Sequence, residues 1–349
     1  MTRIFTTGAE EADVNALWDK VDCSNGSVFI SQTLPFGSID TLVTPPRTGR
    51  GMYNLSNASY LQKDFGTDTS HTDMYFGFAV MFVNLVAEKF FYAYEDSPGV
   101  FTNYIGLRLN ASGAVEVVRS GTVIATSAVG VIAINTWYYF EVRFLPSNTA
   151  GTGRAVVKVN GATVIDHTGD TTNDLERINA YRFSGNDGSL STYFDDIVVN
   201  TPDGAVNNTY PGMVRLLPIR PDAPGTNSDW TRAGVDMGTD EAQLRNGTFE
   251  FSMLQTASAD ALQDAIPEIP DLPAGATITN IVLTAKAKVD AGAGVIAPMV
   301  IANGTSDISA DQTLITNWRH YQYAWAVNPD DSAAWEEADL SLLKIGVSS

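Results

Sequence analysis

The segment AVVKVNGATVID, residues 155–166, decides the fold. Two short runs rich in β-branched residues, Ala155–Val159 and Ala162–Asp166, flank the dipeptide Asn160-Gly161. Asn and Gly tolerate positive φ at both central positions, which a type I′ turn requires. The segment therefore predicts a β-hairpin.

The residues around this hairpin show the same period of two, broken by Gly and Asn turns, which is typical of antiparallel strands. Expected strands are Tyr104–Leu109, Ala114–Arg119, Thr122–Thr126, Trp137–Phe144 and Thr192–Asn200. The first three, joined by loops of a few residues, predict a meander. The expected buried residues of this half are Trp137, Phe140, Val142, Phe144, Val157, Val159, Phe194 and Ile197.

A turn-rich stretch over residues 201–212, followed by prolines up to Pro224, marks a domain boundary, because such segments cannot pair centrally in a sheet. The predicted domains are 1–203 and 213–349. Strands expected in the second are Thr248–Leu254, Ala276–Val289, Gly294–Ala302 and His320–Val327. The fold class is therefore all-β: a jelly-roll sandwich followed by a smaller antiparallel β domain.

Three segments depart from simple alternation. Ala9–Val21 and Ser258–Ile266 are short candidate helices. Tyr75–Val83 is apolar on both faces, whereas a sandwich strand has one face in the core. A loop, the other domain or a neighbouring subunit is expected to cover its second face.

Composition limits the classes of function. The net charge is −19, from 21 basic and 40 acidic residues, which disfavours binding to nucleic acid or to an anionic membrane surface. The single Cys23 allows no internal disulfide and is expected to be buried. The N-terminus shows no signal peptide, and no apolar run is long enough to span a bilayer. Synthesis in a cytoplasm without membrane insertion is expected.

Several motifs, taken in order, resemble a known family. Residues 135–144 (NTWYYFEVRF), 157–161 (VKVNG), Gly169-Asp170-Thr171 and 193–198 (YFDDIV) are similar to concanavalin A-like, laminin-G-like jelly rolls of bacteriophage structural proteins. Residues 203–231 resemble the connector of those proteins, and residues 320–347 resemble their C-terminal domain. One departure is Thr172, where the family has arginine after Gly-Asp-Thr.

The resemblance implies a non-enzymatic structural protein of a phage particle, made in the host cytoplasm and located in the virion as a tail or head decoration or fibre component. Its expected partners are further copies of itself and other virion proteins, and it could present a glycan- or host-binding face. The alternative is a lectin-like, glycan-binding adhesin, and a polysaccharide-cleaving enzyme is the third hypothesis.

Catalytic motifs are missing from the sequence, which contains no nucleophile elbow, zinc-protease motif or phosphate-binding loop. A glycosidase needs two carboxylates across the scissile bond, whereas Glu116 and Glu141 stand alone in their strands. His71, His167 and His320 form no helical ligand pair and are expected at the surface or on edge strands. No catalytic residue and no cofactor are predicted.

Asp195 and Asp196 are adjacent, so in a regular strand they point to opposite faces, and one carboxylate must face inward. Two interpretations are open. A neighbouring loop could supply amide or hydroxyl donors, or the pair could bind calcium together with Asn186 and Asp187. Tyr321, Tyr323 and Trp325 alternate along one strand, as core aromatics do, with ligand contact as the alternative.

Overall fold

The computed structural model describes residues 3–7, 20–22, 28–32, 51–55, 59–65, 71–95, 104–172, 177–185, 192–217, 221–234, 252–257, 260–267, 269, 272 and 274–349. The chain divides into two compact units, Met1–Leu216 and Leu217–Ser349. The first unit thus includes residues 201–216, which begin at the predicted boundary and are called the boundary segment. Each unit is described separately.

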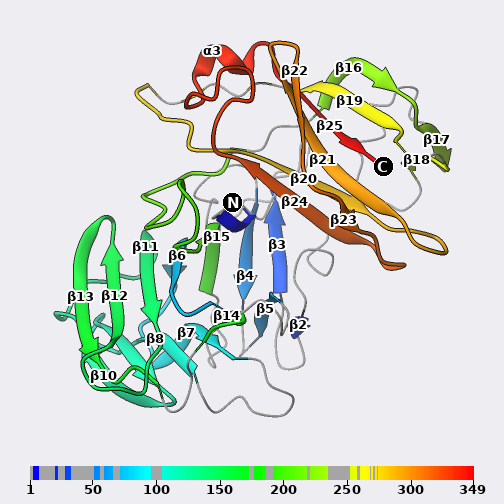
Figure 1. Cartoon of the computed structure of the whole chain (residues 1–349). Coiled ribbons are helices and arrows are strands. Elements are labelled where there is room, and N and C mark those ends of the chain that lie inside the picture. Colours follow the sequence, from blue (N-terminus) through cyan, green and yellow to red (C-terminus); the bar gives the residue numbers. More distant parts are fainter. Residues whose placement is uncertain are drawn as a thin grey trace. The chain divides into compact units, whose positions relative to one another are not determined.

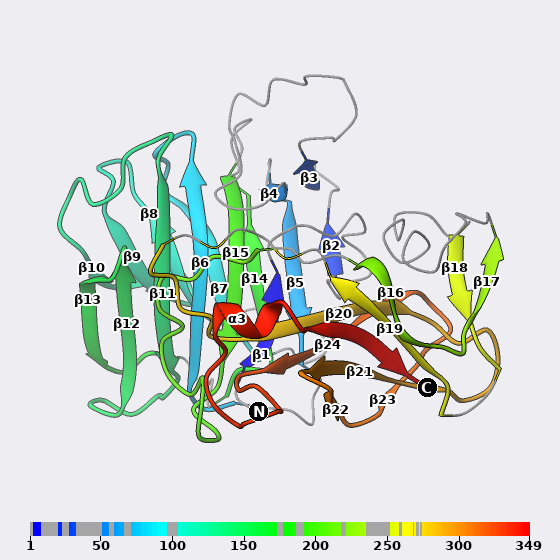
Figure 2. The same cartoon turned by 90° about the horizontal axis from the view of Figure 1, so that it is seen from above.

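Unit 1 is a sandwich of two antiparallel sheets (Figures 1 and 2). Sheet A has the order β13-β12-β11-β6-β15-β4-β3, and β1 also pairs with β15. Its strands are β13 (Ala162–Gly169), β12 (Gly153–Val159), β11 (Trp137–Leu145), β6 (Met74–Phe82), β15 (Thr192–Asn200), β4 (Gly51–Leu55), β3 (Val28–Gln32) and β1 (Arg3–Thr7).

Sheet B has the order β10-β9-β8-β7-β14-β5-β2. Its strands are β10 (Thr122–Thr126), β9 (Val115–Arg119), β8 (Tyr104–Leu109), β7 (Glu88–Tyr94), β14 (Ala180–Ser184), β5 (Tyr60–Asp64) and β2 (Lys20–Asp22). The predicted meander is the run β8-β9-β10. The predicted hairpin is β12-β13, in which Asn160 has φ 48° and Gly161 has φ 82°, as a type I′ turn requires.

The core of unit 1 lies between the two sheets and is rich in phenylalanine. The ring of Phe140 stacks on that of Phe78 with centroids 5.6 Å apart, and Phe183 and Phe194 complete the contact between the sheets. Seven of the eight expected core residues are buried: Phe140, Val142, Phe144, Val157, Val159, Phe194 and Ile197. Trp137 is the exception, because alternation along β11 puts it opposite Phe140, and it is half-buried.

The second face of β6 is covered by the chain itself. The ring of Tyr210 packs edge-on against Tyr75, with centroids 5.1 Å apart. A Cβ added at Gly77 would lie 2.9 Å from Cγ of Pro211, so the glycine makes room for this proline. The predicted boundary segment therefore packs onto the outer face of sheet A. Of the three expected covers, a loop is the one that the structure shows.

Unit 2 contains a sheet of order β16-β19-β25-β21-β22, in which β23 pairs with β21, and two further strand pairs, β17-β18 and β20-β24. The described elements are β16 (Pro221–Ser228), β17 (Thr231–Gly234), β18 (Ser252–Gln255), β19 (Leu262–Pro267), β20 (Ile281–Ala287), β21 (Val295–Ala302), β22 (Thr305–Ile308), β23 (Gln312–Thr313), β24 (Arg319–Trp325), α3 (Glu337–Leu340) and β25 (Lys344–Ser348). Its core includes Val300, Trp325, Trp335 and Leu343.

The helix predicted over Ser258–Ile266 was wrong. Leu262–Pro267 is β19, which pairs with β16 on one side and β25 on the other. Pairing in the sheet outweighs the modest helix propensity of this short run. Most of the other candidate helix, Ala9–Val21, lies outside the described residues, and Lys20–Asp22 at its end is strand β2. Cys23 also lies outside them.

The predicted fold class is confirmed: an all-β chain with a jelly-roll sandwich and a second, smaller antiparallel β unit. The described residues contain no helix long and apolar enough to cross a membrane.

Candidate functional site

The outer face of sheet B gathers polar aromatic and cationic side chains. In β5, β7 and β14 the residues Leu61, Phe91 and Phe183 point into the core. The residues on the opposite face of these strands and of β8 include Tyr60, Gln62, Arg182, Tyr92, Tyr94 and Tyr104. On β7 this alternation begins at Phe91, because a bulge between Lys89 and Phe91 places Phe90 in the core as well. We call the six residues the tyrosine–arginine face; Tyr60 and Tyr92 are half-buried, and the other four are buried.

Strand register brings these residues side by side. Arg182 lies directly opposite Gln62 of β5 and opposite Tyr92 of β7. Tyr94 lies opposite Tyr104 of β8. Gly106 of β8 lies directly opposite Tyr92 of β7, and a Cβ added to this glycine would lie 2.7 Å from Cβ of Tyr92. The glycine therefore leaves room for the tyrosine beside it.

Arg182 is at the centre of this face. Its Nε donates to Oε1 of Gln62 at 2.5 Å, and its Nη1 donates to the Tyr92 hydroxyl at 3.3 Å. Its guanidinium carbon lies 4.0 Å from the ring centroid of Tyr60 and 5.4 Å from that of Tyr94. Burial lowers the pKa of Arg182, but Tyr92, Tyr94 and Tyr60 more than offset this, so its pKa is raised and the charge is retained.

Lys89 brings a second positive charge to the same face. Its Nζ donates to the Tyr104 hydroxyl at 3.1 Å. It also lies 4.6 Å from the centroid of the Tyr104 ring and 5.7 Å from that of Tyr92. Since the Arg182 guanidinium lies 5.9 Å from the Tyr92 centroid, both cations approach one ring.

Carboxylates near this face are engaged by other groups. Asp64 accepts from Nε2 of Gln62 at 2.5 Å. Glu116 forms an ion pair with Arg108 at 2.6 Å and accepts from Asn110 at 3.0 Å. Arg108 and Glu116 thus offset each other's charge, while Arg182 and Lys89 add positive charge to a chain that is strongly acidic. The arrangement suits an anionic or polar ligand that has faces able to stack on rings.

On the outer face of sheet A, carboxylates accept hydrogen bonds from backbone N–H groups. Glu141 is buried, and its Oε1 accepts the backbone N–H of Gly212 at 2.9 Å. Asp195 and Asp196 are both fully buried. Oδ1 of Asp195 accepts the N–H of Asp196 at 2.7 Å, and Oδ1 of Asp196 accepts that of Leu216 at 2.8 Å.

The assumption that adjacent residues of this strand face opposite ways does not hold. The register between β15 and β6 shifts between Asp195 and Val198, and Asp196 has φ 50°. This β-bulge is why Phe194 and Ile197, three positions apart, both reach the core. The donors to the Asp196 carboxylate include a backbone amide of the boundary segment, in line with the first of the two interpretations. Asn186 and Asp187, the other calcium candidates, lie outside the described residues.

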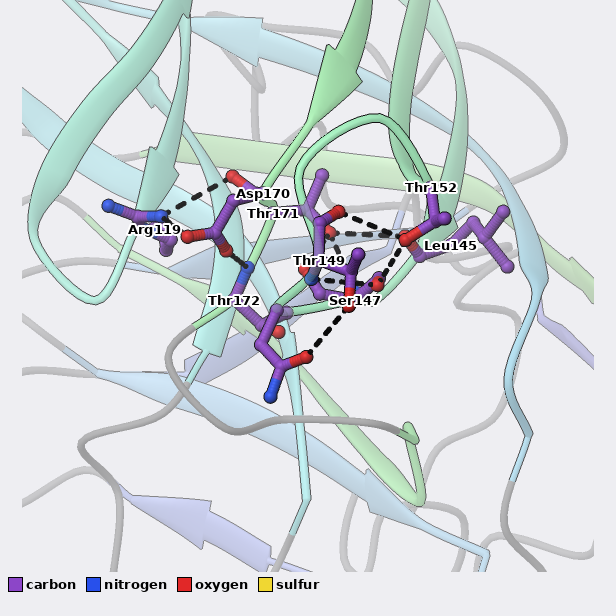
Figure 3. Close-up of polar contacts among 9 residues, drawn as sticks. Arg119, Leu145, Ser147, Thr149, Thr152, Asp170, Thr171 and Thr172 are labelled. Carbon is purple, nitrogen blue, oxygen red and sulfur yellow. Dashed lines mark hydrogen bonds and ion pairs between the residues drawn. The ribbon is translucent and has the colours of Figure 1, made fainter.

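The Gly-Asp-Thr turn, which belongs to the family resemblance, is held by hydrogen bonds (Figure 3). Oγ1 of Thr171 accepts the N–H of Ser147 at 3.0 Å and donates to the carbonyl of Leu145 at 3.1 Å. Asp170 forms an ion pair with Arg119 at 2.5 Å and accepts the N–H of Thr172. The resembling family has arginine at the position of Thr172, which is buried in this chain. Here Arg119 of strand β9 contacts the turn. The arrangement joins the loop to strand β9 through Asp170 and to the end of β11 through Thr171.

The other sequence candidates are spread across both units. His71 forms an isolated bridge with Ile178, and burial lowers its pKa despite Asp203. His167 lies on β13 and His320 on β24, and in the described sheets neither strand pairs with the segment that contains His71. Tyr321 and Trp325 are buried in the core of unit 2, as expected of alternating aromatics, and Tyr323 is half-buried. Among the described residues no three His, Cys, Asp or Glu side chains group as metal ligands would.

No protein-family model and no curated protein sequence matches this chain. Solved structures with a similar fold include the endo-β-1,4-glucuronan lyase of the fungus Trichoderma reesei, with 14% identity, a TM-score of 0.41, and coverage of 57% of this chain and 96% of that one. The alginate lyase Aly36B has 15% identity, a TM-score of 0.37, and coverage of 56% and 92%. The receptor-binding domain of botulinum neurotoxin type G has 11% identity, a TM-score of 0.33, and coverage of 57% and 48%.

The prediction that the chain has no enzymatic activity is corrected by these comparisons, because two of the structures named are polysaccharide lyases. The prediction rested on the absence of the paired carboxylates that a hydrolase needs. Elimination needs no such pair, so their absence cannot exclude every enzyme that cleaves polysaccharides. At these identities the likeness is one of fold, and it assigns no activity to this chain.

Proposed function

We propose that this chain is a glycan-binding protein of a bacteriophage particle, carried on a tail or head appendage, and that it binds glycan through the tyrosine–arginine face of sheet B. The observation that carries the binding function is the arrangement of Tyr92 with Arg182 and Lys89. The ordered resemblance of residues 135–347 to phage structural proteins supports the place on a particle.

Physical chemistry supports a sugar as the ligand. Tyrosine combines an apolar ring, on which the face of a sugar can stack, with a hydroxyl that forms hydrogen bonds. Guanidinium, ammonium and amide groups beside the rings supply further donors to sugar oxygens. Tyr60 of β5 and Lys89 and Tyr92 of β7 are the half-buried members of this group, whereas Arg182, Gln62, Tyr94 and Tyr104 are buried. Strands β5 and β7 flank β14, so at a strand spacing of about 4.8 Å the half-buried groups extend over roughly 10 Å, which suits one or two sugar residues.

The other outer face is a poorer candidate. Tyr210 and Pro211 of the boundary segment occupy sheet A next to Tyr75 and Gly77. Glu141 and Asp196, which lie there, already accept backbone amides of this segment. These contacts occupy this part of the outer face of sheet A and leave less of it for a ligand.

A glycan array with matched variants tests the binding function. Tyr92→Ala removes a ring of the proposed site, and Tyr193→Ala removes a half-buried ring on the outer face of sheet A. We expect the first variant to lose binding and the second to bind as the unmodified chain does, with both keeping the far-ultraviolet circular dichroism of the parent. A Tyr92→Ala variant that binds glycan unchanged would contradict the proposal.

Immunogold labelling tests the location on a particle. Antibody against the purified chain should decorate phage particles from a lysate that contains this protein. Particles that carry no label, while the same antibody detects the chain free in the lysate, would contradict the virion role and leave glycan binding to be judged by the array.

A second candidate is a polysaccharide lyase that uses the same face. The observation in its favour is the hydrogen bond from Lys89 to the Tyr104 hydroxyl, because a tyrosine held by a cation is a group suited to proton transfer. In such an elimination a base removes the proton α to a carboxylate, the carbon–carbon double bond forms, and the neighbouring glycosidic C–O bond breaks. Ultraviolet absorbance of an unsaturated uronate, lost in Tyr104→Phe, would support it. An unchanged spectrum over every acidic polysaccharide offered would refute it.

A further inference from the structure

From the charges on the tyrosine–arginine face we infer that it selects acidic glycans, whose sugars carry carboxylates, over neutral ones. This inference rests on the proposed glycan binding and names the class of ligand. It requires that the positive charge of Lys89 and Arg182 acts on the ligand, beyond the stacking that the tyrosine rings offer to any sugar.

The charge distribution provides the first argument. The chain has 21 basic and 40 acidic residues, so a random part of its surface is expected to be negative. On this face two cations approach the ring of Tyr92, at 5.7 Å for Lys89 Nζ and 5.9 Å for Arg182 Cζ. A local reversal of sign attracts anions that the rest of the surface repels.

The surroundings of the two cations provide the second argument. The hydrogen bonds of the buried Arg182 to Gln62 and Tyr92 fix its guanidinium in place. Among the described residues, the half-buried Lys89 contacts through Nζ the hydroxyl and ring of Tyr104 and the ring of Tyr92, which are neutral. A cation held by neutral partners in a partly buried place is screened less than one in open water.

A nucleic acid is also anionic and can stack on tyrosine. It is disfavoured because a long phosphate backbone would extend beyond this small face, over a molecule whose net charge is −19. An acidic oligosaccharide has its charges spaced along a neutral ring scaffold. It therefore fits a face in which rings and cations alternate.

Paired polymers that differ only in charge make the test. The protein is titrated with polygalacturonate and with its methyl ester, which has the same backbone without the charge, and with alginate, hyaluronate and polysialate. We expect binding to at least one acidic polymer, about tenfold weaker binding to the uncharged counterpart, and a Kd that rises with salt.

Variants then assign the effect to the face. Lys89→Gln should weaken binding of the acidic polymer about tenfold and leave neutral sugars unaffected, and Lys89→Arg should restore most of the loss. The matched control is Lys158→Gln, which removes a lysine that lies 3.6 Å from the Tyr210 ring on the outer face of sheet A. This control should bind as the parent does.

The outcomes separate the inference from the function on which it rests. Equal binding to the acid and to its ester would overturn the acidic preference and leave glycan binding standing. Binding to oligothymidylate but to no acidic polysaccharide would overturn the inference in favour of nucleic acid. Failure to bind any glycan, acidic or neutral, would overturn the proposed function as well.

Discussion

Glu141 and Gly212 are linked by a hydrogen bond of 2.9 Å, in which the backbone amide of the boundary segment donates to a carboxylate in the middle of sheet A. Glu141 is 4% exposed. Glu141→Ala removes the acceptor of this hydrogen bond, which should lower the free energy of unfolding by about 0.5–1.5 kcal/mol. Urea unfolding measures this. Glu141→Gln retains an acceptor oxygen and should cost less; equal losses in the two variants would contradict the role given to this bond.

Phe140 tests the assignment of core and outer faces along β11. Its ring is fully buried and stacked on Phe78, so Phe140→Ala should cost about 3–5 kcal/mol of unfolding free energy. Trp137 lies on the other face and is half-buried, so Trp137→Ala should cost under about 2 kcal/mol despite its larger ring. The reverse order in a denaturant titration would show that the faces have been exchanged.

Gly77 controls how closely the boundary segment approaches the sheet. The added methyl of Gly77→Ala would collide with the Tyr139 hydroxyl and lie 2.9 Å from Cγ of Pro211. We expect this segment to be pushed outward, so proteases should cleave residues 204–216 faster. Gly294→Ala, where the nearest atoms lie at ordinary contact distances of 3.4 Å, is the control and should be cleaved as the parent is.

The free energy of unfolding should depend on the ionisation of Tyr210 at alkaline pH. Burial raises its pKa to about 12, against the opposing effect of Arg143. Since the folded value exceeds the value of about 10 for an unfolded tyrosine, this stabilising contribution is present below pH 10 and is lost as the pH rises through about 12. Phenolate absorbance should show one fewer late-titrating tyrosine in Tyr210→Phe than in the parent, and an unchanged number would contradict this assignment.

Much of the sandwich follows from local pattern. The alternation over residues 104–126 and the Asn160-Gly161 turn are local features, and the strands they predict match β8, β9, β10, β12 and β13 within a few residues. The sequence alone could not predict which segment covers the outer face of β6, because Tyr210 and Tyr75 are far apart in the chain. Strand β19 was predicted as a helix because its pairing partners, β16 and β25, are also not adjacent to it in the sequence.

The candidate site was missed for the same reason. The positions of Tyr92 and Tyr94 opposite the core residues Phe91 and Ala93 could be predicted from the alternation of residues 91–94, whereas the bulge that also places Phe90 in the core could not. What alternation cannot give is register between strands. Arg182 meets Gln62 only because β14 pairs with β5, and the two residues are separated by 120 positions. The sequence search favoured acidic pairs, whereas the face that emerged contains tyrosines and cations.

The bulge at Asp196 has a consequence for how relatives of this chain can diverge. Because one extra residue is accommodated there, deleting residue 196 would restore strict alternation. Ile197 and Val199 would keep their core positions, but the Asp196 carboxylate, which accepts the backbone N–H of Leu216, would be lost. Deleting any neighbouring residue of β15 instead would leave the bulge and move core side chains to the outer face. Aligned homologues should therefore either keep the bulge with Asp, Asn or Gly at this position or lack this one residue.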